Sequence, residues 1–304
     1  MSGKTLLTVV GPTAIGKTKL AIDLATYFKT EIISADSRQF YKEMSIGTAV
    51  PSRYELEEIP HHFIQHKSIQ EKYNVGDFEK DALNVLNNIF KKYDIAIMVG
   101  GSGLYINAVI YGLDSFPGVD REIRTKLNTI HKQEGIEVLQ NQLKELDAEY
   151  YAKVDIQNPH RIIRALEICL GTGKTYSSFI NKKKPPRPFT SFVLGLSMER
   201  SLLYDKINKR VDSMIESGLI EEARSLYKYK HLNALQTVGY TELFNVFDGI
   251  WDLDFAISEI KKNTRRFAKR QLTWFRKNED ILWLDVSTPI DEILDNIKYL
   301  KKDM

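Results

Sequence analysis

Short apolar runs alternate with segments of helical spacing over the first hundred residues and again over the C-terminal half of the chain. Continuous apolar runs of this length are typical of strands that are buried on both faces of a parallel sheet. The pattern predicts strands at 6–10, 31–35, 95–99, 189–196 and 281–286. It predicts helices after the first strand and at 78–92, 201–229 and 254–277. This alternation indicates an α/β fold, a parallel sheet with helices on both faces.

The strand signals disappear between Pro117 and Leu170. Helical patterns rich in Glu, Lys and Leu take their place at 121–134, 136–146, 147–153 and 159–170. We interpret residues 116–170 as an all-helical insertion domain within a core domain formed by residues 1–115 and 171–304. The adjacent Pro185 and Pro186 forbid a helix and predict an exposed connection back to the core.

The composition narrows the class of protein. The 304 residues are 43% hydrophobic and 27% charged, which is ordinary for a globular protein. A single cysteine, Cys169, rules out a disulfide framework and a cysteine-based metal cluster. No apolar run approaches the roughly 20 residues of a membrane span, and the first apolar run ends in a glycine-containing loop, unlike a signal peptide. We therefore expect a cytoplasmic protein without a membrane partner.

The clearest motif follows the first predicted strand. Residues 11–18 match the pattern G-x-x-x-x-G-K-[ST], and helix-forming residues come directly after it. In this strand–loop–helix context, backbone N–H groups and the helix N-terminus bind phosphate oxygens, Lys17 supplies a positive charge, and the Thr18 hydroxyl can reach Mg²⁺. The predicted phosphate-binding residues are Gly11, Pro12, Thr13, Ala14, Ile15, Gly16, Lys17 and Thr18.

An acidic residue at the end of the second strand indicates what the loop is used for. A P-loop hydrolase carries a magnesium-binding acid at the end of a later strand, but here the 95–99 strand ends in Gly-Gly-Ser. Asp36 instead ends the 31–35 strand, and the carboxyl ends of parallel strands face one crevice. This favours transfer from a phosphorylated donor to an acceptor, with Asp36 as a general base. The alternative is that Asp36 only caps a turn.

Positive charge is concentrated near the C-terminus. Residues 261–277 contain eight Lys and Arg and no acid, interleaved with Phe267, Trp274 and Phe275. Such a segment is a candidate nucleic-acid interface. The alternative is an amphipathic helix whose aromatic side chains pack inward while its cations are only solvated.

Seven segments, in order, resemble those of the bacterial tRNA dimethylallyltransferase family, also called tRNA isopentenyltransferases. They are GPTAIGKT (11–18), ISADSRQFY (33–41), IGTA (46–49), VGGSGLY (99–105), NPHRIIRALE (158–167), QTVGY (236–240) and AKRQLTWFR (268–276). The resemblance runs nearly from end to end. It implies a P-loop NTPase-like parallel sheet flanked by helices, with the helical insertion domain contacting the anticodon stem.

The resemblance also implies a reaction. Such enzymes transfer a dimethylallyl group from dimethylallyl diphosphate to N6 of the adenosine 3′ of the anticodon, position 37, and release diphosphate. By this analogy the phosphate loop binds the diphosphate of the donor. Lys17, Arg210, and Thr18 with Mg²⁺ neutralise the leaving group, and Asp36 accepts the proton of the amine.

By the same analogy a larger set of residues contacts the tRNA, and we expect a monomer. This set is Asp36, Ser37, Arg38, Gln39, Ser102, Arg124, His160, Arg161, Ile162, Ile163, Arg164, Gln236, Thr237, Val238, Gly239, Tyr240, Thr241, Lys269, Arg270, Gln271, Leu272, Thr273, Trp274, Phe275, Arg276 and Lys277. Simpler roles remain open for some members: ion pairs for Arg161 and Arg164, a tight turn for Gly239, and core packing for Trp274.

Two other functions stay open at this point. A relative that prenylates free adenine nucleotides would use the same donor but would need neither the basic segment nor the insertion. A P-loop small-molecule kinase would need ATP on the loop and a second clamp for phosphate.

Overall fold

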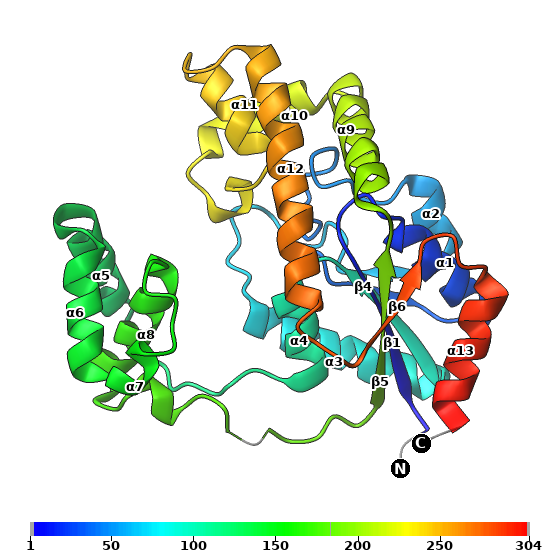
Figure 1. Ribbon diagram of the computed structural model, residues 1–304, viewed down its shortest axis with the longest axis horizontal. Helices are drawn as coiled ribbons and strands as arrows, with labels where there is room; N and C mark the ends of the chain where they lie inside the picture. Colours follow the sequence, from blue (N-terminus) through cyan, green and yellow to red (C-terminus); the bar gives the residue numbers. More distant parts are fainter. Residues whose placement is uncertain (1–2, 183, 303–304) are drawn as a thin grey trace. The chain divides into compact units, whose positions relative to one another are not determined.

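A parallel sheet of six strands forms the centre of the part of the chain that the structure describes (Figure 1). This structure is a computed structural model that describes residues 3–182 and 184–302. The strand order is β3-β2-β4-β1-β5-β6, and every neighbouring pair is parallel. The bounds are β1 (Thr5–Val10), β2 (Ile32–Ser34), β3 (His61–His62), β4 (Ile95–Gly100), β5 (Thr190–Ser197) and β6 (Ile281–Asp285).

The central strands explain the continuous apolar runs in the sequence. β1 pairs with β4 and β5, with Val9 opposite both Val99 and Leu194, and all six residues of β1 and of β4 are buried. The five predicted strands are confirmed. β3 was not predicted, because a strand of two residues leaves no periodic pattern.

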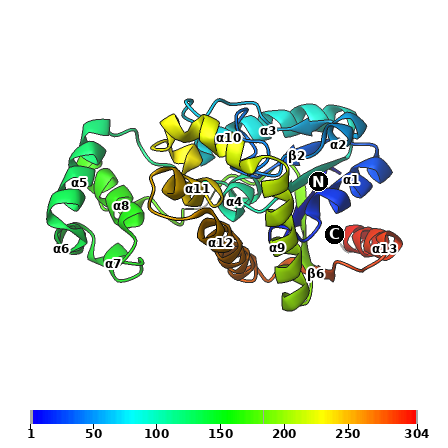
Figure 2. The same cartoon turned by 90° about the horizontal axis from the view of Figure 1, so that it is seen from above.

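Helices cover both faces of the sheet (Figure 2). On one face, α1 (Lys17–Phe28) and α13 (Ile290–Lys302) pack against the sheet through residues such as Leu24 and Ile297. On the other face, α3 (Val75–Lys92) and α4 (Gly103–Tyr111) pack through Phe78 and Val109. The short helix α2 (Arg53–Glu58) precedes β3. The predicted α/β fold is confirmed.

A third group of helices lies beyond the carboxyl ends of the strands (Figure 1). Its elements are α9 (Arg200–Glu216), α10 (Leu219–Leu226), η2 (Tyr227–Tyr229), η3 (Asn233–Leu235), α11 (Tyr240–Phe247) and α12 (Leu253–Phe275). They share a core around Tyr240, Leu243 and Ile260. The single helix predicted over 201–229 is wrong. Gly218, with φ 100°, separates α9 from α10, because a left-handed residue ends a helix.

The helical segment forms a second compact unit, Gly112–Pro186, which we call the insertion unit; the remainder is the core unit. The insertion unit contains α5 (Arg121–Glu134), α6 (Ile136–Leu146), α7 (Ala148–Tyr151), α8 (Pro159–Thr172) and η1 (Tyr176–Ser178). It extends past the predicted 116–170 at both ends. One reason is that the backbone N–H and hydroxyl of Ser177 donate to the buried Asp147, at 2.7 and 2.9 Å. No helix among the described residues is long and apolar enough to cross a membrane.

Candidate active site and RNA interface

The loop between β1 and α1 has the backbone of a phosphate cradle. Gly11 (φ 151°) and Gly16 (φ 107°) adopt conformations that side chains rarely allow, and a Cβ on Gly11 would lie 3.1 Å from the carbonyl oxygen of Leu196. No side chain caps the start of α1, so its first N–H groups are available to an anion. A cavity of about 380 Å³ opens here, lined by Thr13, Lys17 and Thr18 among others. We call it the donor cavity.

The charged residues that line the donor cavity include Lys17, Arg210 and Asp36, together with Lys19 and Glu55. Lys17 Nζ donates to the carbonyl of Pro12 at 2.7 Å. Burial lowers the pKa of Lys17 to about 8, with Asp36 opposing and Arg210 adding to that shift. Burial also lowers the pKa of Arg210, which comes from α9. Because burial disfavours both positive charges, an anion bound between them would be strongly attracted. The geometry therefore fits a multiply charged phosphate ligand.

Asp36 lies where the donor cavity meets a second one. The second cavity, of about 730 Å³, is lined by Asp36, Ser102, Gln236, Gly239 and Trp274 among others, and we call it the acceptor cavity. The residues that line both cavities are Thr13, Asp36, Thr48, Arg210, Phe267 and Gln271. Asp36 Oδ1 also accepts a hydrogen bond from the backbone N–H of Arg38 at 3.0 Å. The carboxylate thus caps its turn and faces both cavities, so the two interpretations of Asp36 are compatible.

Gln271 connects the walls of the site. Its Oε1 accepts from the backbone N–H of Thr13 at 2.9 Å, and its Nε2 donates to the carbonyl of Gly101 at 3.0 Å. The buried side chain therefore joins the phosphate loop to the turn after β4. Ser102 continues this turn and accepts from the backbone N–H of Ser37 at 3.1 Å. The amide of Gln39 donates to the carbonyls of residues 48 and 49, at 3.2 and 2.9 Å.

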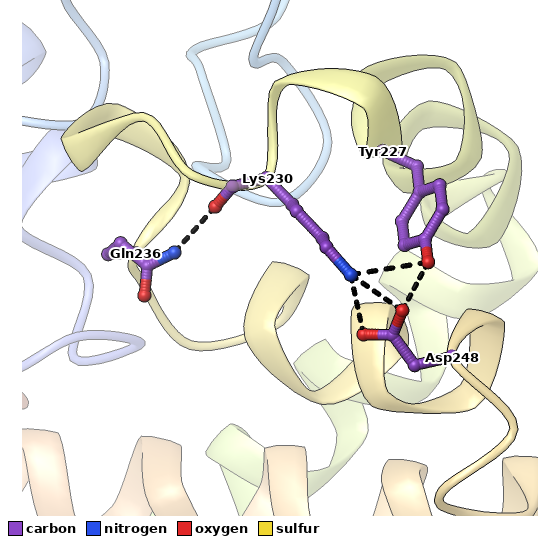
Figure 3. Close-up of polar contacts among 4 residues, drawn as sticks. All are labelled: Tyr227, Lys230, Gln236 and Asp248. Carbon is purple, nitrogen blue, oxygen red and sulfur yellow. Dashed lines mark hydrogen bonds and ion pairs between the residues drawn. The ribbon is translucent and has the colours of Figure 1, made fainter.

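One wall of the acceptor cavity is formed by residues 236–239 and Thr241. Gly239, with φ 98°, makes the turn into α11, and Gln236 Nε2 donates to the carbonyl of Lys230 at 2.5 Å (Figure 3). Lys230 Nζ in turn binds both carboxylate oxygens of Asp248, at 2.6 and 2.8 Å. The cavity that Asp36 lines is thus also lined by five predicted residues, Gln236, Thr237, Val238, Gly239 and Thr241.

The basic residues of α12 divide into two groups. Near its middle, Lys261 pairs with Asp212 at 2.5 Å and Arg265 donates to Asn208 at 2.7 Å, so these cations bind α9. Farther along, a run of polar, charged and aromatic side chains is exposed: Arg266, Phe267, Lys269, Arg270, Thr273, Trp274, Arg276 and Lys277. The ring of Trp274 contacts Gly103, where an added Cβ would come within 2.2 Å of it. Trp274 is thus partly packed and 39% exposed.

Several predicted RNA-binding residues have enclosed side chains. They are Ile162, Ile163, Tyr240 and Phe275, which are buried, and Leu272, which packs against the core. These residues can support a binding surface but do not present a side chain to it. In the insertion unit, Arg124 and Arg164 pair with the buried Glu167 at 3.2 and 2.9 Å, as one interpretation of Arg164 anticipated. His160 and Arg161 are exposed at the start of α8.

Sequence reasoning missed Glu222. Its carboxylate accepts from the backbone N–H groups of residues 45, 46 and 47, each at 2.9 Å, and from the hydroxyl of Tyr240 at 2.7 Å. It thereby holds the IGTA segment, whose Thr48 lines both cavities. An isolated glutamate on a helix gives no local signal of this role.

Comparison with known proteins is decisive for the family. The sequence model of the family described as IPP transferase matches residues 39–278. The tRNA dimethylallyltransferase of Christiangramia forsetii is 61% identical over 293 residues, which is 96% of this chain and 97% of that protein. The chain belongs to the tRNA dimethylallyltransferase family. The enzyme of that name from Flavobacterium johnsoniae is 56% identical over 96% of both chains.

Solved structures of the tRNA dimethylallyltransferase family have the same fold. A tRNA isopentenylpyrophosphate transferase from Bacillus halodurans is 38% identical, with a TM-score of 0.72 over 98% of this chain and 95% of that one. A eukaryotic dimethylallyltransferase described as acting on tRNA is 30% identical, with a TM-score of 0.81 over 93% of this chain and 74% of that one. The resemblance that the seven sequence segments indicated is confirmed.

Proposed function

We propose that this chain transfers a dimethylallyl group from dimethylallyl diphosphate to N6 of the adenosine at position 37 of tRNA and releases diphosphate. The observation that supports this most directly is the placement of Asp36. It lies between a phosphate-binding cavity and a wider cavity bordered by the exposed end of the basic helix α12. A donor diphosphate and an acceptor base would meet at this carboxylate. Membership of the tRNA dimethylallyltransferase family supports the same chemistry.

The donor cavity supplies what departure of diphosphate requires. As the N6 lone pair attacks C1 of the prenyl group, the C1–O bond breaks and its electron pair leaves with the diphosphate. The phosphate-loop N–H groups, Lys17 and Arg210 stabilise the charge that develops there. A contact of this kind that is made mainly in the transition state contributes about 2.7–4 kcal/mol. Asp36 accepts the N6 proton, which restores a neutral amine.

Mg²⁺ is the cofactor that the donor cavity fits. Thr18 is the last residue of the phosphate loop and lines the donor cavity, and Mg²⁺ typically takes only one or two protein ligands together with substrate phosphates and waters. In the described ranges 3–182 and 184–302, no cluster of three or more His, Cys, Asp or Glu offers an all-protein metal site. The Thr18 hydroxyl would therefore be the protein group that holds the ion. When bound, this ion offsets negative charge on the leaving group.

The acceptor cavity is large enough for an extruded base. Its volume of about 730 Å³ lies within the range of ligand pockets, and a nucleotide must leave the anticodon-loop stack to reach Asp36, at a cost of a few kcal/mol. Residues 236–241 and the exposed side chains of α12 offer amides, hydroxyls and cations to the loop. The insertion unit would contact the anticodon stem. All the groups that these steps use come from one copy of the chain, so we propose that it acts as a monomer in the cytoplasm.

The test is where a labelled prenyl group goes. The protein is incubated with labelled dimethylallyl diphosphate and one of three acceptors: a tRNA transcript with adenosine at position 37, the same transcript with guanosine there, or AMP. We expect label only in the adenosine transcript, with mass spectrometry placing it on that nucleotide. Label in AMP alone would favour a nucleotide prenyltransferase. Consumption of ATP with no prenyl transfer would favour a kinase.

A further inference from the structure

The side chain of Arg38 grips main-chain carbonyl groups. One guanidinium nitrogen, Nη1, donates to the carbonyls of Asn233 and Ala234 at 2.8 and 3.0 Å, and Nη2 donates to that of Gln236 at 3.4 Å. A guanidinium can hold several acceptors at once because its N–H groups form a rigid planar fork, whereas the ammonium of lysine is a compact point charge. The resemblance to the family implied an RNA contact for Arg38; the residue does line the acceptor cavity, but its guanidinium makes three hydrogen bonds within the protein.

The carbonyls that Arg38 binds lie in the segment that leads into one wall of the acceptor cavity, and of the three residues only Gln236 itself lines the cavity. They come from η3 and the residue after it, and the residues that follow line the cavity. We call residues 230–239 the wall segment. The carbonyl of Asn233 also accepts the backbone N–H of Gln236 at 3.2 Å, and a side chain from elsewhere can donate further hydrogen bonds to the carbonyls at the end of a helix. Arg38 does so from the turn after β2, which carries Asp36.

The other end of the wall segment has its own anchor. The ammonium of Lys230 lies between the carboxylate of Asp248 and the hydroxyl of Tyr227, and the carbonyl of Lys230 accepts from the Gln236 side chain (Figure 3). The segment is therefore fixed at two points. Lys230 connects the segment to Asp248 at the end of α11, and Arg38 connects it to the turn that carries Asp36.

Arg38 also contacts that centre through its backbone. Its N–H donates to Asp36 Oδ1 at 3.0 Å, so one residue holds the carboxylate at its backbone and the wall segment at its guanidinium. We propose that Arg38 is a positioning residue, which fixes the separation between Asp36 and the wall against which the acceptor base rests. This inference rests on the proposed function.

The test separates positioning from phosphate binding. Arg38→Gln and Arg38→Lys are compared with Arg266→Gln, a matched change at an exposed arginine of α12. Two quantities are measured: the single-turnover rate constant at saturating donor and tRNA, and the slope of log Kd for tRNA against log salt concentration. We expect both Arg38 variants to slow the reaction by about 10- to 100-fold, because small misplacements of reacting groups are costly. Their salt slope should equal that of the unaltered protein, whereas Arg266→Gln should lower it by about one unit.

The opposite pattern would overturn the proposal. A salt slope lowered by Arg38→Gln, with rate and slope both restored by Arg38→Lys, would show a phosphate contact instead. An unchanged rate in both variants would show that the grip does not position the base. Thermal unfolding and pyrophosphate affinity establish that each variant is folded.

If neither Arg38 variant folds, a second variant tests the same proposal. Asp248→Asn, which weakens the Lys230 anchor, should slow the reaction without changing the salt slope, and an unchanged rate there would also overturn the proposal. Failure of the proposed function is distinguishable, because the unaltered protein would then transfer no label to tRNA.

Discussion

Among single residues, Lys17 connects the electrostatics of the site to pH. Burial lowers its pKa to about 8 from a value of 10.5 in the unfolded chain. Between these two values the unfolded chain holds a proton that the folded protein has released. The contribution of Lys17 to the free energy of unfolding therefore rises with pH across this window and is least favourable below pH 8. Under the proposed function, binding of diphosphate to the protonated Lys17 would offset this cost.

Pyrophosphate binding should therefore depend on pH through Lys17. As pH rises through about 8, Lys17 of the unliganded protein loses its proton, and the affinity of the unaltered protein for pyrophosphate should fall relative to that of Lys17→Ala. The variant supplies the reference because it reports the titration of pyrophosphate itself. Isothermal titration calorimetry at a series of pH values measures the ratio. A ratio that stays constant across this range would contradict the assigned role of Lys17.

A second prediction concerns Asp36. Asp36→Asn keeps an oxygen to accept from the Arg38 N–H but cannot take up the N6 proton. We expect the single-turnover rate to fall by about 100-fold or more, the usual contribution of a general base, with little change in tRNA affinity. Rapid-quench kinetics and filter binding measure the two quantities. If affinity fell as much as the rate, Asp36 would be a recognition residue instead.

The residue scale also shows what the sequence could and could not predict. The phosphate loop was predictable because its eight residues are contiguous and strand and helix flank it. The structural partners of Gln271 and Arg38 were not, since Gln271 binds a loop 258 residues away and Arg38 binds carbonyls 195 to 198 residues away. Family resemblance places both near RNA, whereas the structure uses both to hold the walls of the site.

At the scale of elements, α12 has two parts: cations near its middle bind α9, and cations farther along are exposed. The sequence predicted the helix and its charge but could not assign individual cations, because the acid that binds Lys261 lies on α9. Local signals likewise failed within 201–229, where one glycine in a left-handed conformation divides a helical pattern in two. A hydrophobic periodicity gives no information about an ion-pair partner on another element or about the torsion angle of a single residue.

This division of α12 predicts a difference between two sets of charge changes. Replacing Arg266, Lys269 and Arg270 together by Gln should reduce the salt slope of tRNA binding by about two to three, because each phosphate contact contributes about 0.7 to 0.9. Lys261→Gln is the control and should leave the slope unchanged, since its ammonium already pairs with Asp212. Binding titrations over a range of salt concentrations measure both. Equal slopes in the triple variant and the unaltered protein would make α12 a merely solvated helix.

On the scale of the whole molecule, the two units have separate cores. The insertion unit packs around Leu127, Leu143 and Leu166, while the three clusters of the core unit draw on neither α5, α6, α7 nor α8. The two connections of the insertion unit also lie side by side, since Lys184 Nζ donates to the carbonyl of Gly112 at 2.8 Å. A short linker could therefore replace residues 115–182 without separating the halves of the sheet.

Such a replacement tests whether catalysis and stem recognition are separable. The shortened protein should unfold cooperatively and bind pyrophosphate like the full chain, because Lys17, Arg210 and the phosphate loop all lie in the core unit. Its kcat/KM for tRNA should fall on the order of 100-fold or more, since a second binding surface on one ligand typically multiplies affinity by that factor. An isolated anticodon loop without its stem should lose much less, because the insertion unit has no stem to contact there. Equal losses for tRNA and for the loop would place the function of the insertion unit at the reacting centre rather than on the stem.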